Sequence, residues 1–264
     1  MFNQINSVHI GGVRIDNVDM KESVQKIIDL IGGKEKHQIS TPNLDFLYNA
    51  SKNHQFRKIL NSTFLNIPDG KPLILLSRLK KKPLKEKVSG ADLFVNICQE
   101  AAKKNICIHL MGSKPGVAAQ AKLNLEKKFS GLNIVGAVSP SFGFETDEAE
   151  STELIEQINK VKPDILFVGV GSPKQELWIA KYLDQLDIKV AIGVGASFDF
   201  AAGHVKIPPP FIKKAGFAWL WRLSIEPKRL WKRYLMNNLP LFIKLACKAI
   251  IFKEDQTDKG NKGN

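Results

Sequence analysis

The segment "DILFVGVGSPKQELWIAKYL", residues 164–183, holds the clearest indication of the fold. It opens with a short apolar run at residues 164–170, and a Gly-Ser-Pro turn follows. Beyond the turn, apolar residues recur at helical spacing. A strand, a tight turn and a helix in this order are typical of a β/α unit. The sequence therefore predicts a strand that ends in a glycine-rich turn and leads directly into a helix.

The same order recurs through the first 200 residues. Apolar runs lead through polar or glycine-rich turns in "HQIS" before "TPNLDFLYNA", "TFLNI" before "PDGKPLILLSRL", "ICIHLM" before "GSKPGVAAQAKLNLEKKF", and "KVAIGV" before "GASFDFAAG". Repeated alternation of this kind predicts an α/β fold, a Rossmann-like and mostly parallel sheet flanked by helices. We assign residues 1–203 to this core.

The composition changes after residue 203. Of the 39 Lys and Arg residues 13 lie beyond this point, against 4 of the 26 acidic residues, so most of the net charge of +13 is here. Three prolines at 208–210 suit a linker. Trp and Tyr then alternate with Arg and Lys, and apolar residues recur at helical spacing as far as residue 250. This pattern predicts a basic amphipathic helical appendage at a membrane surface, residues 204–253, and a disordered tail, residues 254–264.

Composition also bounds the setting of the protein. The three cysteines show no metal-ligand or disulfide spacing, which favours a reducing compartment. The first 15 residues lack the pattern of a signal peptide, and no uncharged apolar stretch reaches about 18 residues. We therefore expect a cytoplasmic protein without a spanning helix, and no motif calls for a cofactor.

The predicted strand-to-helix turns carry the polar candidates for a site. In open α/β sheets, ligands bind at the carboxyl ends of the strands, where these turns gather. One cleft is expected there, lined by Thr41, Asn43, Asp69, Gly112, Ser113, Gly169, Gly171, Ser172 and Gln175.

The turn after residue 170 admits two interpretations. Ser172 and Gln175 have the spacing of a capping box, with Pro173 at the first helical position. Such a helix start suits a phosphate, although the same residues would serve merely to begin a helix. Lys174 and Gln175 add little to helix initiation, and this favours contact with a ligand. "GSKPG", residues 112–116, poses the same choice.

Asp69 lies in "IPDGK", and Pro-Asp-Gly is ordinary turn chemistry. Only its position at a predicted strand end favours a catalytic carboxylate. Thr41 and Asn43 in "TPNLD" offer hydrogen-bonding groups, although an N-cap explains the same residues equally well.

Taken together, seven blocks resemble the WecG/TagA/CpsF family of bacterial glycosyltransferases. In order they are "TPNLDFL", "IPDGKPL", "VSGADL", "LMGSKPGVA", "PDILFVGVGSPKQELWI", "IGVGASFDFAAGHVK" and "GFAWLWRLSIEPKRLWKRY". The resemblance runs from about residue 7 to residue 234. The SPKQE block and the final Trp- and Arg-rich block are its most specific parts.

The resemblance implies an inverting, metal-independent transferase. It would move N-acetylmannosamine or its uronic acid from UDP to N-acetylglucosaminyl diphospho-undecaprenol, for teichoic acid or another surface polysaccharide. The implied partners are a UDP-sugar, the lipid-linked acceptor and the inner face of the plasma membrane, with a homo-oligomer left open. The chain lacks the Asp-x-Asp pair that often holds a metal in such enzymes, so Arg, Lys or helix N-termini would meet the charge of the leaving diphosphate.

The family pattern also implies residue roles. Asp69 takes the position of the general base, and Thr41 and Asn43 stand beside it. The substrate-binding residues expected from the turns and the family pattern are Lys87, Gly112, Ser113, Gly171, Ser172, Lys174, Gln175, Arg222, Arg229 and Arg233. Lys87 and Ile207 depart from the pattern, since arginine is common at both positions. Both fall on expected sugar or phosphate contacts, so the sugar is left open.

Three alternatives remain at this point. The same fold could use another UDP-hexose for capsule or exopolysaccharide. The basic, aromatic C-terminal segment would also suit single-stranded nucleic acid, although its apolar periodicity favours lipid. A nucleotide-dependent oxidoreductase would need the full glycine fingerprint and a ribose-binding acid, and neither is evident.

Overall fold

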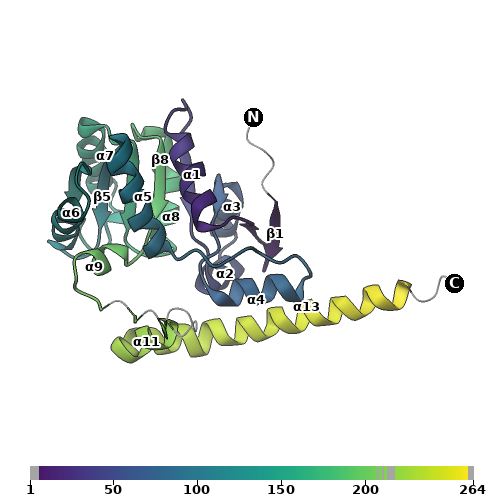
Figure 1. Cartoon of the computed structure of the whole chain (residues 1–264). Helices are drawn as coiled ribbons and strands as arrows, with labels where there is room; N and C mark the ends of the chain where they lie inside the picture. The colour runs from purple at the N-terminus through teal and green to yellow at the C-terminus, as the bar shows by residue number, and fades with distance from the viewer. Residues whose placement is uncertain (1–5, 207, 210, 213–217, 261–264) are drawn as a thin grey trace.

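The centre of the molecule is a six-stranded parallel sheet in the order β4-β3-β8-β7-β5-β6 (Figure 1). The computed structural model describes residues 6–206, 208–209, 211–212 and 218–260, without the side chains of 218, 229 and 252–260. The strands are β3 (His37–Ser40), β4 (Leu65–Asn66), β5 (Cys107–Gly112), β6 (Asn133–Val138), β7 (Ile165–Gly169) and β8 (Val190–Gly193). The predicted α/β fold with a parallel sheet is confirmed.

The register brings the carboxyl ends of the strands to one edge. Ile165 of β7 lies opposite Ile108 of β5 and Val190 of β8, and Val190 also lies opposite His37 of β3. All residues of β7 and β8 are buried, as expected for strands covered on both faces. The turns that follow β3, β4, β5, β7 and β8 therefore share one side of the molecule.

Two apolar cores cover the faces of the sheet. Because side chains alternate along a strand, Ile165 and Phe167 enter one core, whereas Leu166 and Val168 enter the other. In the first, Phe94 packs edge-on against Phe167 with ring centroids 4.7 Å apart. The first core is covered by α1 (Met20–Leu30), α5 (Gly90–Lys104), α6 (Val117–Lys128) and α9 (Ser197–Ala201). The second is covered by η1 (Phe144–Thr146), α7 (Glu148–Val161), α8 (Lys174–Tyr182) and η2 (Leu183–Gln185).

A third core lies beside the sheet. It is built by the hairpin of β1 (Ser7–Ile10) and β2 (Val13–Asp16) with α2 (Leu44–Lys52), α3 (His54–Ser62) and α4 (Lys71–Leu79). Asp16 is buried, pairs with Arg14 at 3.1 Å, and accepts a hydrogen bond from the Asn66 backbone at 2.7 Å. The hairpin therefore holds β4 in place, and with it the turn that carries Asp69.

The C-terminal appendage is helical and packs on the third core. It comprises α11 (Ala218–Ile225), α12 (Pro227–Trp231), the π-helical segment η3 (Lys232–Asn238) and α13 (Leu239–Gly260). Figure 1 shows α13 running beside α4 and projecting beyond the core. Leu241, Phe242, Leu245 and Ala246 contact the third core. The appendage is thus docked on the core along one side of α13.

The structure differs from the sequence-based expectations at two places in the appendage. Residues 254–260 belong to α13, although the polar composition suggested disorder. Residues 232–251 are also long and apolar enough to cross a membrane, with a mean hydropathy of 1.2. No such helix was expected, because no uncharged apolar stretch of the sequence reaches about 18 residues. This finding rests on length and composition alone, and the domain boundaries themselves stay predictions.

Candidate active site

Asp69 is held by backbone bonds at the carboxyl edge of the sheet. Its N–H donates to the Pro42 carbonyl at 2.8 Å, and the Val88 N–H donates to the Pro68 carbonyl at 2.8 Å. Gly70 follows with φ of 124°, a conformation that suits glycine, and α4 begins at the next residue. The predicted turn is therefore present, and it fixes the position of a half-buried carboxylate.

The carboxylate meets Thr41 at the start of α5. Gly90, the first residue of α5, donates its N–H to Asp69 Oδ2 at 3.3 Å. A Cβ atom on Gly90 would lie 3.2 Å from Thr41 Oγ1 and 3.7 Å from Asp69 Oδ2. The absence of a side chain at Gly90 thus lets the hydroxyl and the carboxylate share one small space. The helix N-terminus also favours the ionised carboxylate.

Asn43 joins this cluster but has a structural task as well. Its Oδ1 caps α2 by accepting from the N–H groups of Asp45 and Phe46 at 3.0 and 3.3 Å. Its Cβ would lie 3.9 Å from a Cβ added to Gly70. The N-cap interpretation of "TPNLD" is therefore confirmed, while Thr41, Asn43 and Asp69 are also brought together.

The charges around Asp69 come from three parts of the chain. Burial is the main cause that raises the pKa of Asp69, with a smaller contribution from Asp92. Lys87, the Gly90 N–H and Arg222 act in the opposite direction. Arg222 lies in α11, with its guanidinium 5.5 Å from the centre of the Phe200 ring. The appendage therefore brings a cation to the neighbourhood of the candidate base.

At the neighbouring strand ends, Gln175 is used inside the protein. Its Oε1 accepts hydrogen bonds from the N–H groups of Gly171 and Gly195, both at 3.1 Å, and so ties the turns after β7 and β8 together. Its Nε2 donates to Glu176 Oε1 at 2.5 Å. The predicted capping box is wrong, because Pro173 is itself the N-cap residue and α8 has no side-chain cap. The Gln175 oxygen is engaged by the two turns instead.

Glu176 completes this second polar cluster. The residue is fully buried, and burial raises the pKa of its carboxyl to about 7, although Gln175 and Ser172 oppose the shift. An added Cβ on Gly193 would come within 2.6 Å of Glu176 Oε1, so that strand passes directly over the carboxyl group. By contrast, a Cβ on Gly171 or Gly195 would meet no atom within 4 Å. The backbone of these two turns therefore faces open space and is supported from below by the buried side chains of Gln175 and Glu176.

The other candidates at the strand ends are placed as follows. Lys174 pairs with Glu145, and its ammonium lies 4.8 Å from the Phe142 ring centre. Gly112 passes so close to β7 that a Cβ would lie 2.6 Å from the Gly169 backbone. Ser113 donates its hydroxyl to Asp199 at 3.3 Å. These contacts explain the residue types through packing, and their roles in binding stay predictions.

The appendage arginines do not share one environment. Arg222 lies near enough to lower the pKa of Asp69, whereas Arg233 pairs with Asp45 of α2 at 2.8 Å. Arg229 belongs to α12, but its side chain lies outside the described residues, as does Ile207. Among the residues that the structure describes, no three His, Cys, Asp or Glu side chains are grouped to hold a metal ion.

Sequence reasoning missed four residues that shape this site. They are Gly90, Asp92, Phe200 and Glu176, and all four fall inside the quoted blocks "VSGADL" and "GASFDFAAG" or the SPKQE motif. A glycine directly before a helical apolar pattern signals a close approach at the helix start. For Glu176 no local signal was available, because its burial depends on β8 lying above it.

These features define an α/β protein with a polar site at the carboxyl edge of its sheet, where one carboxylate lies within the electrostatic influence of cations from the core and the appendage. The glycosyl transferase WecG/TagA/CpsF family model matches residues 8–256, and the chain belongs to this family.

Named bacterial relatives agree with the family. A protein of Bacillus subtilis (strain 168) is 32% identical over 84% of this chain and 81% of its own length. One of Bacillus spizizenii is 31% identical over 80% and 78%, and one of Staphylococcus aureus (strain MRSA252) is 27% identical over 92% of both chains. All three are named N-acetylglucosaminyldiphosphoundecaprenol N-acetyl-beta-D-mannosaminyltransferase.

Proposed function

We propose that the protein transfers N-acetylmannosamine from a UDP-sugar to N-acetylglucosaminyl diphospho-undecaprenol, as the names of its relatives describe for the acceptor and the sugar. The observation that carries the proposal is the placement of Asp69. Its half-buried carboxylate lies beside Thr41 and the start of α5, within the influence of Lys87 and Arg222. Such an arrangement offers a base and cations in one place.

The reaction is a single displacement. An acceptor hydroxyl attacks the anomeric carbon, the bond from that carbon to the UDP oxygen breaks, and the hydroxyl proton passes to the Asp69 carboxylate. Attack from the side opposite the leaving group inverts the configuration. Burial raises the pKa of Asp69, and this makes the ionised group a better proton acceptor.

Cationic side chains take the place of a metal in this proposal. The departing UDP gains negative charge, and preorganised cations are the usual means of stabilising it. Arg222 and Lys87 are the cations whose charge reaches Asp69. The open backbone at Gly171 and Gly195 lies two to three strands further along the same edge, about 10 to 14 Å away at the usual strand spacing. That span suits a nucleoside diphosphate extended along the edge.

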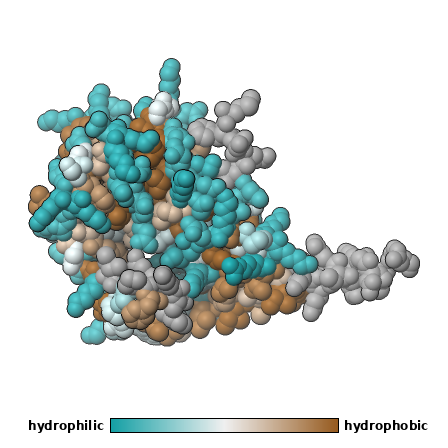
Figure 2. All heavy atoms as spheres, viewed as in Figure 1, coloured by the Kyte–Doolittle hydropathy of each residue, from teal (hydrophilic) through white to brown (hydrophobic). Residues whose placement is uncertain are grey.

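The appendage would hold the enzyme on the membrane that carries the acceptor. Large apolar side chains on its outer side are exposed, and the apolar surface follows α13 along the lower edge of the molecule in Figure 2. They include Trp219, Leu220, Trp231, Leu235, Met236, Leu239, Ile243, Ile250 and Ile251. Since the opposite side of α13 packs on the third core, the helix is better suited to lie in the interface than to cross the bilayer. We place the protein on the cytoplasmic face of the plasma membrane, and a homo-oligomer stays a prediction.

A donor screen tests the proposal. Purified protein is offered a panel of UDP-hexoses and a synthetic lipid-diphosphate-GlcNAc, and release of UDP and the anomeric configuration of the product are measured. We expect turnover with UDP-N-acetylmannosamine, an inverted product, and the same rate with EDTA. Turnover with only another UDP-hexose would overturn the donor, and loss of activity with EDTA would overturn the role given to the cations.

Membrane association has its own test. Replacing Met236 and Ile243, which are 61% and 53% exposed, by Gln should weaken sedimentation with vesicles while leaving turnover of a short-chain soluble acceptor unchanged. Replacing Leu123 of α6, which is 61% exposed, by Gln is the matched control. Equal vesicle binding by both variants would contradict the proposed face.

A further inference from the structure

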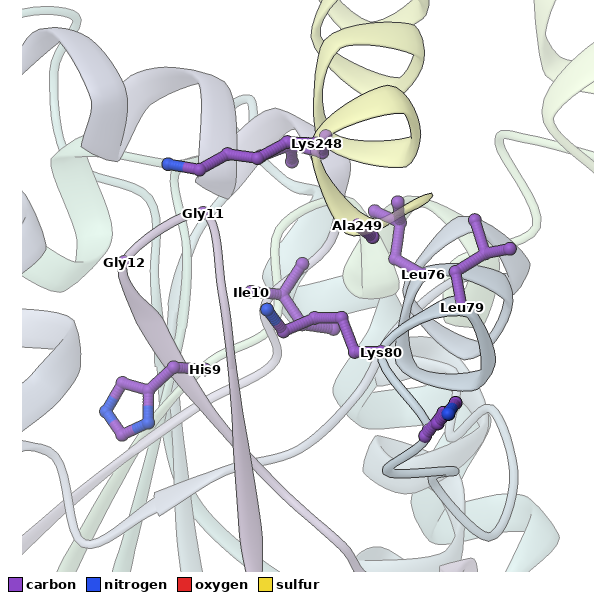
Figure 3. A pocket seen from close by; sticks show the side chains of 11 residues that line it. His9, Ile10, Gly11, Gly12, Leu76, Leu79, Lys80, Lys248 and Ala249 are labelled. Atoms are coloured by element: carbon purple, nitrogen blue, oxygen red, sulfur yellow. The ribbon is translucent and has the colours of Figure 1, made fainter. Parts of the chain in front are cut away.

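A basic pocket lies between the hairpin, α4 and α13, away from the candidate active site. It has a volume of about 370 Å³. Its walls are the turn at Gly11 and Gly12, the last turn of α4, and the side of α13 that faces the core (Figure 3). A Cβ on Gly11 would lie 3.5 Å from Leu245, so the hairpin turn is packed directly against α13. The pocket therefore exists only because the appendage is docked.

The lining combines cations with apolar surface. His9, Lys80, Lys81 and Lys248 contribute the polar part, and none of the described residues that line the pocket is acidic. In Figure 3, the side chains of Lys80 and Lys248 extend toward the hairpin turn, whereas Leu76 and Leu79 lie on the side of the pocket formed by α4 and α13. Leu245 and Ala249 add to the apolar part. This combination fits a small anionic group joined to an apolar chain.

The pocket opens beside the apolar face of α13. Ile250 and Ile251, next to the lining residues Lys248 and Ala249, are 46% and 60% exposed. A lipid whose headgroup enters the pocket can therefore lay its chains along the same helix. The volume falls at the small end of ligand sites, which suits a headgroup and excludes a whole lipid.

The diphosphate of the acceptor does not account for this site. Asp69 precedes α4 and Lys80 follows it, and nine helical residues span about 13 Å. In the proposed reaction, only one sugar ring separates the attacked hydroxyl from the acceptor diphosphate. That diphosphate must therefore lie near Asp69, at the other end of α4.

We propose that this pocket binds the phosphate headgroup of an anionic phospholipid in the membrane surface. The proposal rests on the membrane association proposed above and adds a lipid preference to it. With the headgroup held between α4 and α13, the amino-terminal end of α4 and Asp69 would face the membrane-borne acceptor in a fixed orientation.

Vesicle binding by the full chain tests the preference. The probes are phosphatidylcholine vesicles with and without phosphatidylglycerol, and a soluble short-chain phosphatidylglycerol with inorganic phosphate for comparison. We expect the wild type to prefer vesicles with phosphatidylglycerol, and to bind the soluble lipid more tightly than phosphate. Substitution of Lys80 and Lys248 by Ala should weaken binding of phosphatidylglycerol, both in vesicles and as the soluble lipid, by roughly 20- to 30-fold. Each cation near an anionic surface contributes about fivefold.

Two further variants separate a pocket from diffuse attraction. Lys127→Ala with Lys160→Ala removes the same charge from exposed ends of α6 and α7 and should change binding less than about threefold. Ala249→Gln fills the pocket without altering charge and should abolish binding of the soluble lipid.

The outcomes are distinct. Equal losses of lipid binding in the Lys80/Lys248 and Lys127/Lys160 double variants, or wild-type binding by Ala249→Gln, would overturn the proposal that the pocket binds the headgroup. Inorganic phosphate binding as tightly as the soluble lipid would assign it to free phosphate instead. Failure to bind any vesicle, with the soluble lipid still bound, would refute membrane association and leave the pocket standing.

Discussion

The Asp69 turn and the Gln175 turn begin in the same way but hold their side chains in different environments. Each follows a strand of the parallel sheet, contains proline and glycine, and leads directly into a helix. At Gln175, the side-chain oxygen is engaged by two backbone N–H groups, and the next residue is fully buried. At Asp69, the backbone is fixed while the carboxylate stays half-buried beside a threonine and two cations.

The two environments distinguish a candidate catalytic residue from a residue that supports the site. Both turns hold polar side chains at the carboxyl edge, where ligands are expected. A side chain whose polar atoms bond other parts of the fold supports the site, whereas a half-buried carboxylate with cations nearby is able to react. Variants at the two turns should therefore fail in different ways.

The largest effect is expected at Asp69. Asp69→Asn keeps the size of the side chain and removes the proton acceptor, so turnover should fall by about 10³-fold. UDP binding and the thermal midpoint should stay close to those of the wild type, because the turn is held by backbone bonds. Turnover within tenfold of the wild type would exclude Asp69 as the base.

Gln175 should show the opposite pattern. Gln175→Ala leaves the N–H groups of Gly171 and Gly195 and the carboxyl of Glu176 without their partner, which should cost about 3 kcal/mol of unfolding free energy. Urea denaturation measures this loss of unfolding free energy, and Gln157→Ala on the exposed face of α7 is the matched control. A variant as stable as the control would show that the two turns are not joined through this side chain.

The buried carboxyl of Glu176, next to Gln175, makes the unfolding free energy depend on pH. The pKa of Glu176 rises from 4.5 in the unfolded chain to about 7 in the fold. Between these values the folded state binds more protons, so the contribution of Glu176 to stability is full below pH 4.5 and is lost as the pH rises through 7.

Glu176→Gln should remove this dependence. Raising the pH from 4.5 to 8 should lower the unfolding free energy of the wild type, relative to the variant, by on the order of 2 to 3 kcal/mol. Asp45 and Asp69, whose pKa values burial also raises, and His109, whose pKa burial lowers to about 4, contribute to both proteins. Comparing urea midpoints of the two proteins across this range cancels those contributions, and parallel pH profiles would contradict the assignment.

Local pattern was sufficient for five of the six strands of the parallel sheet and for the position of Asp69 at a strand end. The alternation of apolar runs with helical periods predicted five strand-to-helix units of the observed sheet. It did not predict that Gln175 joins two turns, because Gly195 lies 20 residues away and approaches only through the pairing of β7 with β8. The family resemblance implied that Arg222 binds substrate, but the closeness of Arg222 to Asp69 was not predicted, since it depends on how the appendage docks.

The smallest effect concerns that docking. Arg233 pairs with Asp45 at 2.8 Å, but its side chain is 37% exposed, so solvent screens much of the attraction. Arg233→Met keeps the apolar stem and should weaken the attachment of η3 and the start of α13 by about 1 kcal/mol. Amide hydrogen exchange in these segments should then quicken by roughly fivefold, whereas exchange in the sheet should not change. Lys232→Met, an exposed neighbour, is the control. Faster exchange in the sheet as well would mean that the appendage stabilises the core as a whole, and the contrast between a fixed core and a separately attached appendage would then be lost.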